Sequence, residues 1–87
     1  MPPPVPERIF PNPVNDMLTI EMVLDEPTDL VFSLLNTLGQ RLIRLEHSKT
    51  PSGRFSTTVP CQHLAKGAYI LEIRHQKRHS FHYFVKY

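Results

Sequence analysis

Apolar and polar residues alternate along most of this chain, and a period of two predicts short β-strands. The segment Met17–Leu24 shows the pattern most clearly, because every second side chain from Leu18 onwards is apolar. Five further segments combine alternation with β-forming residues and lie between turn residues, namely Asp29–Asn36, Arg41–Glu46, Arg54–Val59, Ala68–Arg74 and Ser80–Tyr87. Short strands at this spacing are typical of a small all-β sandwich, in which two antiparallel sheets bury their apolar faces against each other.

The alternation also predicts which side chains face the core. In the last segment, Ser80–Tyr87, we expect Phe81 and Tyr83 to point inward, which leaves Phe84 and Lys86 pointing away from the core. In the earlier segments the expected inward side chains are the alternating apolar ones, including Ile20, Leu30, Phe32, Leu34, Phe55, Val59, Tyr69, Leu71 and Ile73.

Glycine and proline residues mark the connections between these segments. Asn36–Gln40 is expected to form a tight hairpin turn in which Gly39 adopts a positive φ. His47–Gly53 is expected to be a polar loop. Pro60–Lys66 is expected to be irregular, with Leu64 filling a gap in the core.

The first thirteen residues contain six of the nine prolines. Proline fixes φ and has no N–H donor, so residues 1–13 are expected to form an extended linker that precedes a single domain at residues 14–87. Pro11-Asn12-Pro13 is expected to be a stiff corner in which the Asn12 side chain bonds its own backbone.

Composition narrows the class of protein. With 87 residues, 40% of them hydrophobic and 21% charged, the chain fits one ordinary globular domain, and a net charge of +2 gives no argument for nucleic acid. The single cysteine, Cys61, excludes an intramolecular disulfide and is expected to pack as a small apolar residue. No apolar run is long enough to span a bilayer, and no signal peptide is visible, so we interpret the chain as part of a longer protein.

Candidate chemistry is sparse. His75, His79 and His82 lie close in sequence, but the odd separation of the last two places them on opposite faces of a strand, which disfavours a metal site. The basic run from Arg74 to His79 is interpreted as a solvated turn, or alternatively as a contact for an anionic surface. The carboxylates are scattered and no glycine-rich phosphate loop exists, so we expect no enzyme activity and no cofactor.

Four segments taken together carry a family resemblance. They are "FPNPVNDMLTI" at Phe10–Ile20, "FSLLNTLGQRL" at Phe32–Leu42, "LAKGAYILEI" at Leu64–Ile73 and "FVKY" at Phe84–Tyr87. Their order and spacing resemble the C-terminal sorting domain of proteins exported by the type IX secretion system of Bacteroidetes-type bacteria. The residues that match the family pattern are Pro11, Asn12, Pro13, Leu18, Ile20, Gly39, Leu64, Gly67 and Tyr69. Two positions depart from it, because Ala68 stands where a β-branched residue is common and Tyr87 follows Lys86 at the chain end.

This resemblance implies a fold and a role. The fold would be a small immunoglobulin-like sandwich of six to seven antiparallel strands. The role would be that of a label that is recognised in the periplasm and guides its parent protein through the outer-membrane translocon. A sortase-like surface peptidase would then remove the label, somewhere in or upstream of Pro2–Phe10, and the parent protein would be joined to an anionic lipopolysaccharide or released. Some members of the family instead keep the domain and act as parts of the machinery.

The expected recognition element is the last strand, Ser80–Tyr87, which would lie at a sheet edge or be exposed along its end. A partner would read it through side chains or by adding a strand to its free backbone groups. The candidate contact residues are Phe84, Val85, Lys86 and Tyr87, of which Phe84 and Lys86 are preferred. The alternatives are a carbohydrate-binding or adhesive sandwich, which should present an exposed aromatic platform, and a structural appendage of an upstream enzyme. A homodimer through an uncapped edge strand stays open.

Overall fold

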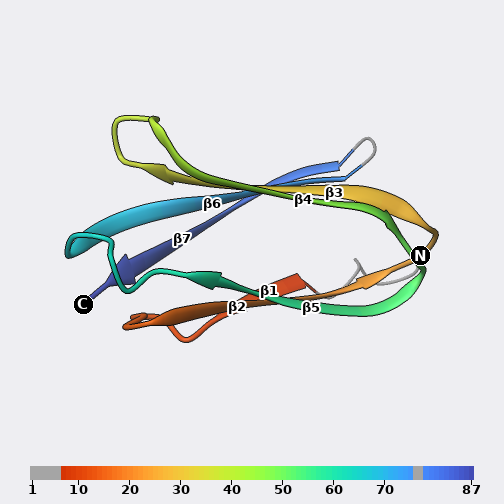
Figure 1. The fold of residues 1–87 in the computed structure, drawn as a ribbon, viewed down its shortest axis with the longest axis horizontal. Helices are drawn as coiled ribbons and strands as arrows, with labels where there is room; N and C mark the ends of the chain where they lie inside the picture. Colours follow the sequence, from red (N-terminus) through yellow and green to blue (C-terminus); the bar gives the residue numbers. More distant parts are fainter. Residues whose placement is uncertain (1–6, 76–77) are drawn as a thin grey trace.

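The protein folds into two β-sheets that pack face to face. The computed structural model describes residues 7–75 and 78–87. Figure 1 shows the sheets as two layers seen edge-on. Within the described residues there are seven strands and no helix: β1 (Glu7–Phe10), β2 (Met17–Leu24), β3 (Thr28–Asn36), β4 (Arg41–Thr50), β5 (Gly53–Pro60), β6 (Gly67–His75) and β7 (Arg78–Lys86). The prediction of a small all-β sandwich is confirmed.

The strands are divided unequally between the two sheets. One sheet has three strands in the order β1-β2-β5, and the other has four in the order β4-β3-β6-β7. All neighbouring strands run antiparallel. The last strand, β7, therefore lies at an edge of the larger sheet, as the sequence predicts, and β4 forms the opposite edge.

The core lies between the sheets and consists of the alternating apolar side chains of the central strands. Residues that lie opposite each other on neighbouring antiparallel strands point to the same face of the sheet. The inward residues of one strand therefore determine which residues of the next strand point inward. Thus Leu34 on β3 lies opposite Leu71 on β6, and both side chains are buried. The buried apolar residues are Val14, Leu18, Ile20, Met22, Leu24, Leu30, Phe32, Leu34, Val59, Cys61, Tyr69, Leu71, Ile73 and Phe84.

The β3–β4 hairpin confirms the predicted turn. Gly39 has a φ of +82°, a conformation that glycine adopts without the clash that a Cβ would cause. The Asn36 side chain completes the turn, since its Oδ1 accepts hydrogen bonds from the amides of Leu38 at 2.9 Å and Gln40 at 3.0 Å. β4 continues to Thr50, four residues beyond the predicted end of this strand, and so replaces much of the expected loop.

The first strand corrects the expectation that residues 1–13 are a linker. Glu7–Phe10 pairs with Thr19–Met22 of β2 along its whole length. This segment contains no proline, so all of its N–H groups can take part in hydrogen bonding between strands. The many prolines on either side of it make the whole region look like a linker in the sequence. The remainder of the expected linker, residues 1–6, lies outside the described residues.

The last strand corrects a second expectation, because its inward and outward faces are exchanged relative to the prediction. Phe84 and Lys86 are 1% and 8% exposed, whereas Phe81 and Tyr83 are 51% and 73% exposed. The cause is the register with β6, which places Phe84 opposite Tyr69. Since Tyr69 points into the core, Phe84 must do so too, and the two rings stack with centroids 5.8 Å apart.

Candidate recognition site on the last strand

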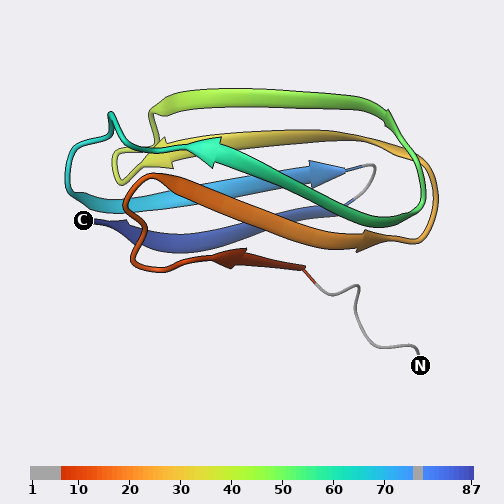
Figure 2. The same ribbon diagram turned by 60° about the horizontal axis from the view of Figure 1, so that its bottom comes forward.

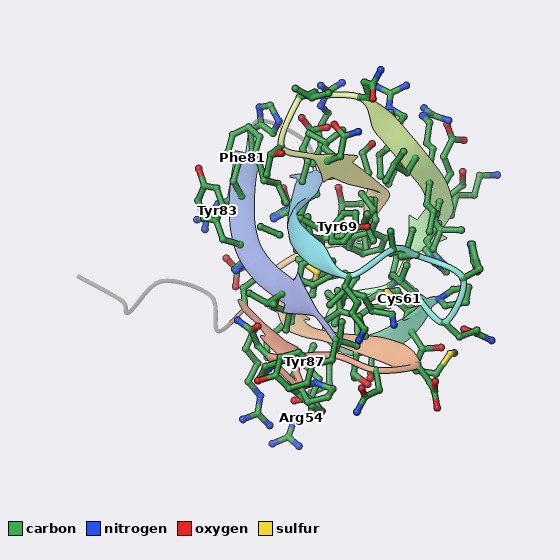
Figure 3. The ribbon with its side chains drawn as sticks, turned by 90° about the vertical axis from the view of Figure 1, so that its left-hand side faces the viewer. Arg54, Cys61, Tyr69, Phe81, Tyr83 and Tyr87 are labelled. Atoms are coloured by element: carbon green, nitrogen blue, oxygen red, sulfur yellow. The ribbon has the colours of Figure 1, made fainter. Side chains whose placement is uncertain are left out.

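The end of β7 presents a row of outward side chains on an edge strand. Phe81, Tyr83 and Val85 alternate along the strand, and Tyr87 directly after its end continues the row. All four are exposed, with values of 42% for Val85 and 63% for Tyr87. Figure 3 shows Phe81 and Tyr83 projecting away from the sandwich. We call these four residues the β7 outer row. Of the predicted contact residues, the structure places Val85 and Tyr87 at the surface and Phe84 and Lys86 in the interior.

The backbone edge beside this row is closed by the segment that follows β1. The amide of Val14 donates to the carbonyl of Val85 at 2.8 Å, and the amide of Tyr87 donates to the carbonyl of Val14 at 3.0 Å. Val14 thereby forms a parallel bridge with Lys86. Val14 is itself fully buried, so this short segment is anchored in the core while it covers the edge.

Asn12 extends the closure by one more position. Its Oδ1 accepts a hydrogen bond from the amide of Val85 at 3.0 Å, and its Nδ2 donates to the carbonyl of Tyr83 at 3.4 Å. The side chain thus replaces a neighbouring strand instead of bonding its own backbone as the sequence suggests. Pro11 and Pro13 flank it, and the peptide bonds that precede both prolines are cis.

On its buried side, the end of β7 packs against Tyr69, whose hydroxyl group is hydrogen-bonded. Tyr69 stacks on Phe84, and its hydroxyl donates to the carbonyl of Ala65 at 2.5 Å. Gly67, with a φ of +153°, begins β6 opposite Lys86. Leu64 packs against the core from the preceding loop, as predicted. These contacts fix the backbone from which the β7 outer row projects.

Cys61 lies beneath the same strand end. Burial raises the pKa of its thiol, and a hydrogen bond with the Leu18 backbone together with the positive charge of Lys86 offsets part of that rise. The amide of Cys61 donates to the carbonyl of Asp16 at 2.7 Å. A buried thiol with a raised pKa is a poor nucleophile, so this residue packs as the small apolar side chain expected from the sequence.

The middle of β7 is tied to β1 by a polar contact between the two sheets. Glu7 Oε1 accepts a hydrogen bond from Ser80 Oγ at 2.6 Å and lies 2.5 Å from His82 Nε2. Figure 2 shows β1 and β7 on the same side of the molecule. Serine and histidine both contact one carboxylate oxygen and do not form a relay from nucleophile to base to acid, so the cluster is a structural tie.

The histidines considered as metal ligands do not converge on one site. His79 lies 2.9 Å from Glu72 on the outer face of the sheet, away from the contact that His82 makes with Glu7. Within residues 7–75 and 78–87, no group of three or more ligand side chains is placed to hold a metal ion. Two residues of the basic turn, Gln76 and Lys77, lie outside the described residues.

Comparison with known proteins identifies the family. The family model described as the secretion system C-terminal sorting domain matches residues 8–86, which span all but the first residue of the seven strands. This chain belongs to that family. No curated protein matches the chain.

As a member, the sorting domain is a C-terminal signal of the type IX secretion system that interacts with the secretion machinery. Its parent protein is exported toward the outer membrane, the cell surface or the medium. Families of sorting signals are generally non-catalytic. In the part of the chain that the structure describes, no helix is long and apolar enough to cross a membrane.

The residues that carry the family resemblance in the sequence fall into two groups in the structure. Leu18, Ile20 and Tyr69 are buried, Gly39 supplies the positive φ of the β3–β4 turn, and Gly67 has a positive φ at the first residue of β6. Asn12 instead contacts the last strand, 71 to 73 residues further along the chain. Sequence reasoning missed that contact and the exposure of Tyr83, and the one available signal was that apolar residues occupy both faces of β7.

Proposed function

We propose that the sorting domain carries its parent protein through the periplasm to the outer-membrane translocon and is then removed. A sortase-like surface peptidase would cleave the chain, and the parent protein would be attached to an anionic lipopolysaccharide or released. The observation that carries this proposal is the sorting-family match over the whole sandwich, together with an edge strand whose outer row is exposed. Retention of the uncleaved domain in a component of the machinery is the alternative outcome of the same signal.

The pairing of β1 bears on where cleavage would occur. A peptidase binds its substrate as an extended, accessible segment, and backbone already paired in a sheet is not available to it. Glu7–Phe10 is paired with β2, and Glu7 is further tied to Ser80. We therefore place the proposed cleavage site before Glu7, upstream of the sandwich.

A reporter fusion tests the proposal. The reporter carries a signal peptide at its N-terminus and residues 1–87 at its C-terminus, and it is expressed in a bacterium with a working type IX system. The expected result is reporter at the cell surface or in the medium, with a mass showing loss of the domain before Glu7. In a strain without the translocon, the uncleaved fusion should accumulate in the periplasm. Retention of the reporter in the periplasm of the competent strain would contradict the proposal.

A second candidate function is a carbohydrate-binding or adhesive sandwich. Phe81 and Tyr83 are exposed on one face of β7, and such a surface is what a sugar-binding platform requires. The same experiment separates the two functions. An adhesive module would leave the fusion in the periplasm and would bind polysaccharide as a purified domain, whereas a sorting signal would export the reporter.

A further inference from the structure

We infer that the secretion machinery reads the sorting domain through the side chains of the β7 outer row and not by adding a strand to the β7 edge between Tyr83 and Tyr87. The matching partner surface is apolar with an acidic border. This inference rests on the proposed function and specifies which atoms of the domain are read. It replaces Phe84 and Lys86, which are buried, with Phe81 and Tyr83, which are exposed.

The backbone groups at the end of β7 are already bonded within the domain. In an antiparallel edge strand, every second residue directs its N–H and C=O groups away from the sheet, and these groups are what an added strand would bind. At the end of β7, the groups of Val85 are both used, by Asn12 and by Val14. The carbonyl of Tyr83 and the amide of Tyr87 are used as well. Strand addition at this end would first have to displace a segment anchored by the buried Val14.

The side chains of the β7 outer row are regularly spaced and rigidly held. Alternate residues of a strand lie about 6.6 Å apart on one face, so the outer row presents four apolar or aromatic side chains in a line of about 20 Å. The row broadens over β6, because Ile70 lies opposite Tyr83 and Ala68 lies opposite Val85. Aromatic side chains on a rigid backbone lose little conformational entropy on binding, which makes them effective anchors in partner pockets.

Charge is distributed unevenly along the chain. Residues 61–87 contain five lysines or arginines and a single carboxylate, Glu72, whereas the rest of the chain has more acidic than basic residues. Glu72 is already paired with His79 and lies 4.0 Å from Arg74. Lys66 is exposed just before β6 begins, beside the end of the outer row. Of the described cations in this segment, Lys86 is buried, whereas Lys66, Arg74 and Arg78 are exposed. These three make the surroundings of the row cationic, and a complementary partner is acidic.

The same charge argues against two other occupants of this surface. A second copy of the domain would bring two cationic surfaces together, which is unfavourable. An anionic membrane would be attracted but would accept any basic aromatic surface, whereas a sorting signal must be distinguished from other proteins in the same compartment. A protein surface with spaced apolar pockets provides that discrimination.

The test is export of the reporter fusion carrying Tyr83→Ser with Val85→Thr. Both side chains are exposed, so the purified variant domain should unfold within about 3 °C of the unchanged domain. The exported fraction should fall about tenfold, with folded fusion retained in the periplasm. The control is Leu38→Ser, which removes an 82% exposed apolar side chain at the β3–β4 turn and should change export less than twofold.

A charge arm tests the acidic border. Lys66→Glu should lower export about threefold, while Arg41→Glu at the opposite edge of the same sheet should leave it unchanged. Normal export of both the Tyr83→Ser/Val85→Thr and the Lys66→Glu fusions would overturn the inference while leaving the proposed function intact. Failure of the unchanged fusion to be exported would instead refute the proposed function.

Two further outcomes separate the competing occupants. If the purified domain binds vesicles rich in phosphatidylglycerol through Tyr83 and binding parallels export in every variant, the surface is a membrane contact and the inference is wrong. If export survives the side-chain changes but rises in Asn12→Ala, which frees the Val85 amide and the Tyr83 carbonyl, the machinery adds a strand to the edge and the inference is wrong.

Discussion

The two edges of the four-stranded sheet solve the same physical problem in different ways. An edge strand exposes unpaired N–H and C=O groups that invite pairing with other chains. At β4 the side chains give protection, since Arg44 and Glu46 form an exposed ion pair and Lys49 interrupts the strand with a φ of +54°. At the end of β7 another segment of the chain gives protection, through Asn12 and Val14.

The difference shows what each kind of protection permits. An edge guarded by charged side chains must keep those charges, so its side chains are not free to serve a binding role. An edge whose backbone groups are already bonded can carry exposed apolar side chains such as Tyr83 and Val85 without offering a template for aggregation. A strand that is to be recognised without sticking to unrelated strands therefore benefits from the second arrangement.

The largest expected effect separates the two faces of β7. Phe84→Ala removes a fully buried ring that stacks on Tyr69, and it should lower the free energy of unfolding by about 3–5 kcal/mol. Phe81→Ala, three residues earlier on the exposed face, should change it by less than about 0.5 kcal/mol. Urea titration followed by circular dichroism measures both values. Equal losses for the two variants would mean that the register of β7 is wrong.

The next effect concerns the closure of the β7 edge. Asn12→Ala removes the hydrogen bonds with the Val85 amide and the Tyr83 carbonyl, and it should lower the free energy of unfolding by about 1–3 kcal/mol. Asn12→Asp keeps an acceptor for the Val85 amide but loses the donor, so its loss should be smaller. If Asn12→Ala leaves the free energy of unfolding unchanged in urea titration, the closure of the edge contributes nothing to stability.

A smaller effect comes from Cys61 beneath the closed end. Burial raises the pKa of this thiol in the folded protein, so the unfolded chain loses the proton first as the pH rises. Folding is then favoured less at higher pH, and stability should decline above about pH 8.5, where an ordinary thiol begins to lose its proton. The free energies of unfolding of the protein and of Cys61→Ala, compared at pH 7 and pH 10, isolate this contribution. A constant difference between the two proteins would contradict it.

The smallest change in stability is expected at the β4 edge. Replacing Arg44 and Glu46 by serine removes an exposed ion pair and should alter the free energy of unfolding by less than about 0.5 kcal/mol. The edge loses its charges, however, so the variant should form dimers or larger species at high concentration in sedimentation experiments. If the unchanged domain forms a homodimer by pairing two edge strands, we propose that the strand used is β4. A variant that stays monomeric would show that these charges do not guard the edge.

The sequence predicts most of the fold because local patterns and global packing agree in it. The strands from Met17 to Ile73 follow from alternation, and Gly39 with Asn36 determines the first predicted hairpin. Alternation does not predict which residues of β7 face the core, because aromatic residues occupy both faces of the strand. The alternating pattern favours Phe81 and Tyr83 as the inward residues, and that choice is wrong. The deciding contact is the pairing of Phe84 with Tyr69, which depends on register and not on local sequence.

The closure of the edge is harder still to predict from the sequence. Asn12 stands between two prolines, a context typical of a turn whose asparagine bonds locally. Its partners lie at the other end of the chain, and nothing in the spacing indicates them. The sequence therefore predicts that Phe84 and Lys86 face outward beside a free backbone edge, whereas the structure buries both side chains and closes the edge beside them.

Hydrogen exchange of individual backbone amides, followed by NMR spectroscopy, tests the central claim most directly. The amides of Val85 and Tyr87 point away from the sheet, yet they are bonded to Asn12 and Val14, so they should exchange as slowly as amides inside the sheet. In Asn12→Ala, exchange at Val85 should become faster. Exchange of both amides in the unchanged domain at the rate of free, solvated backbone would contradict the account, because the edge would then be open to an added strand.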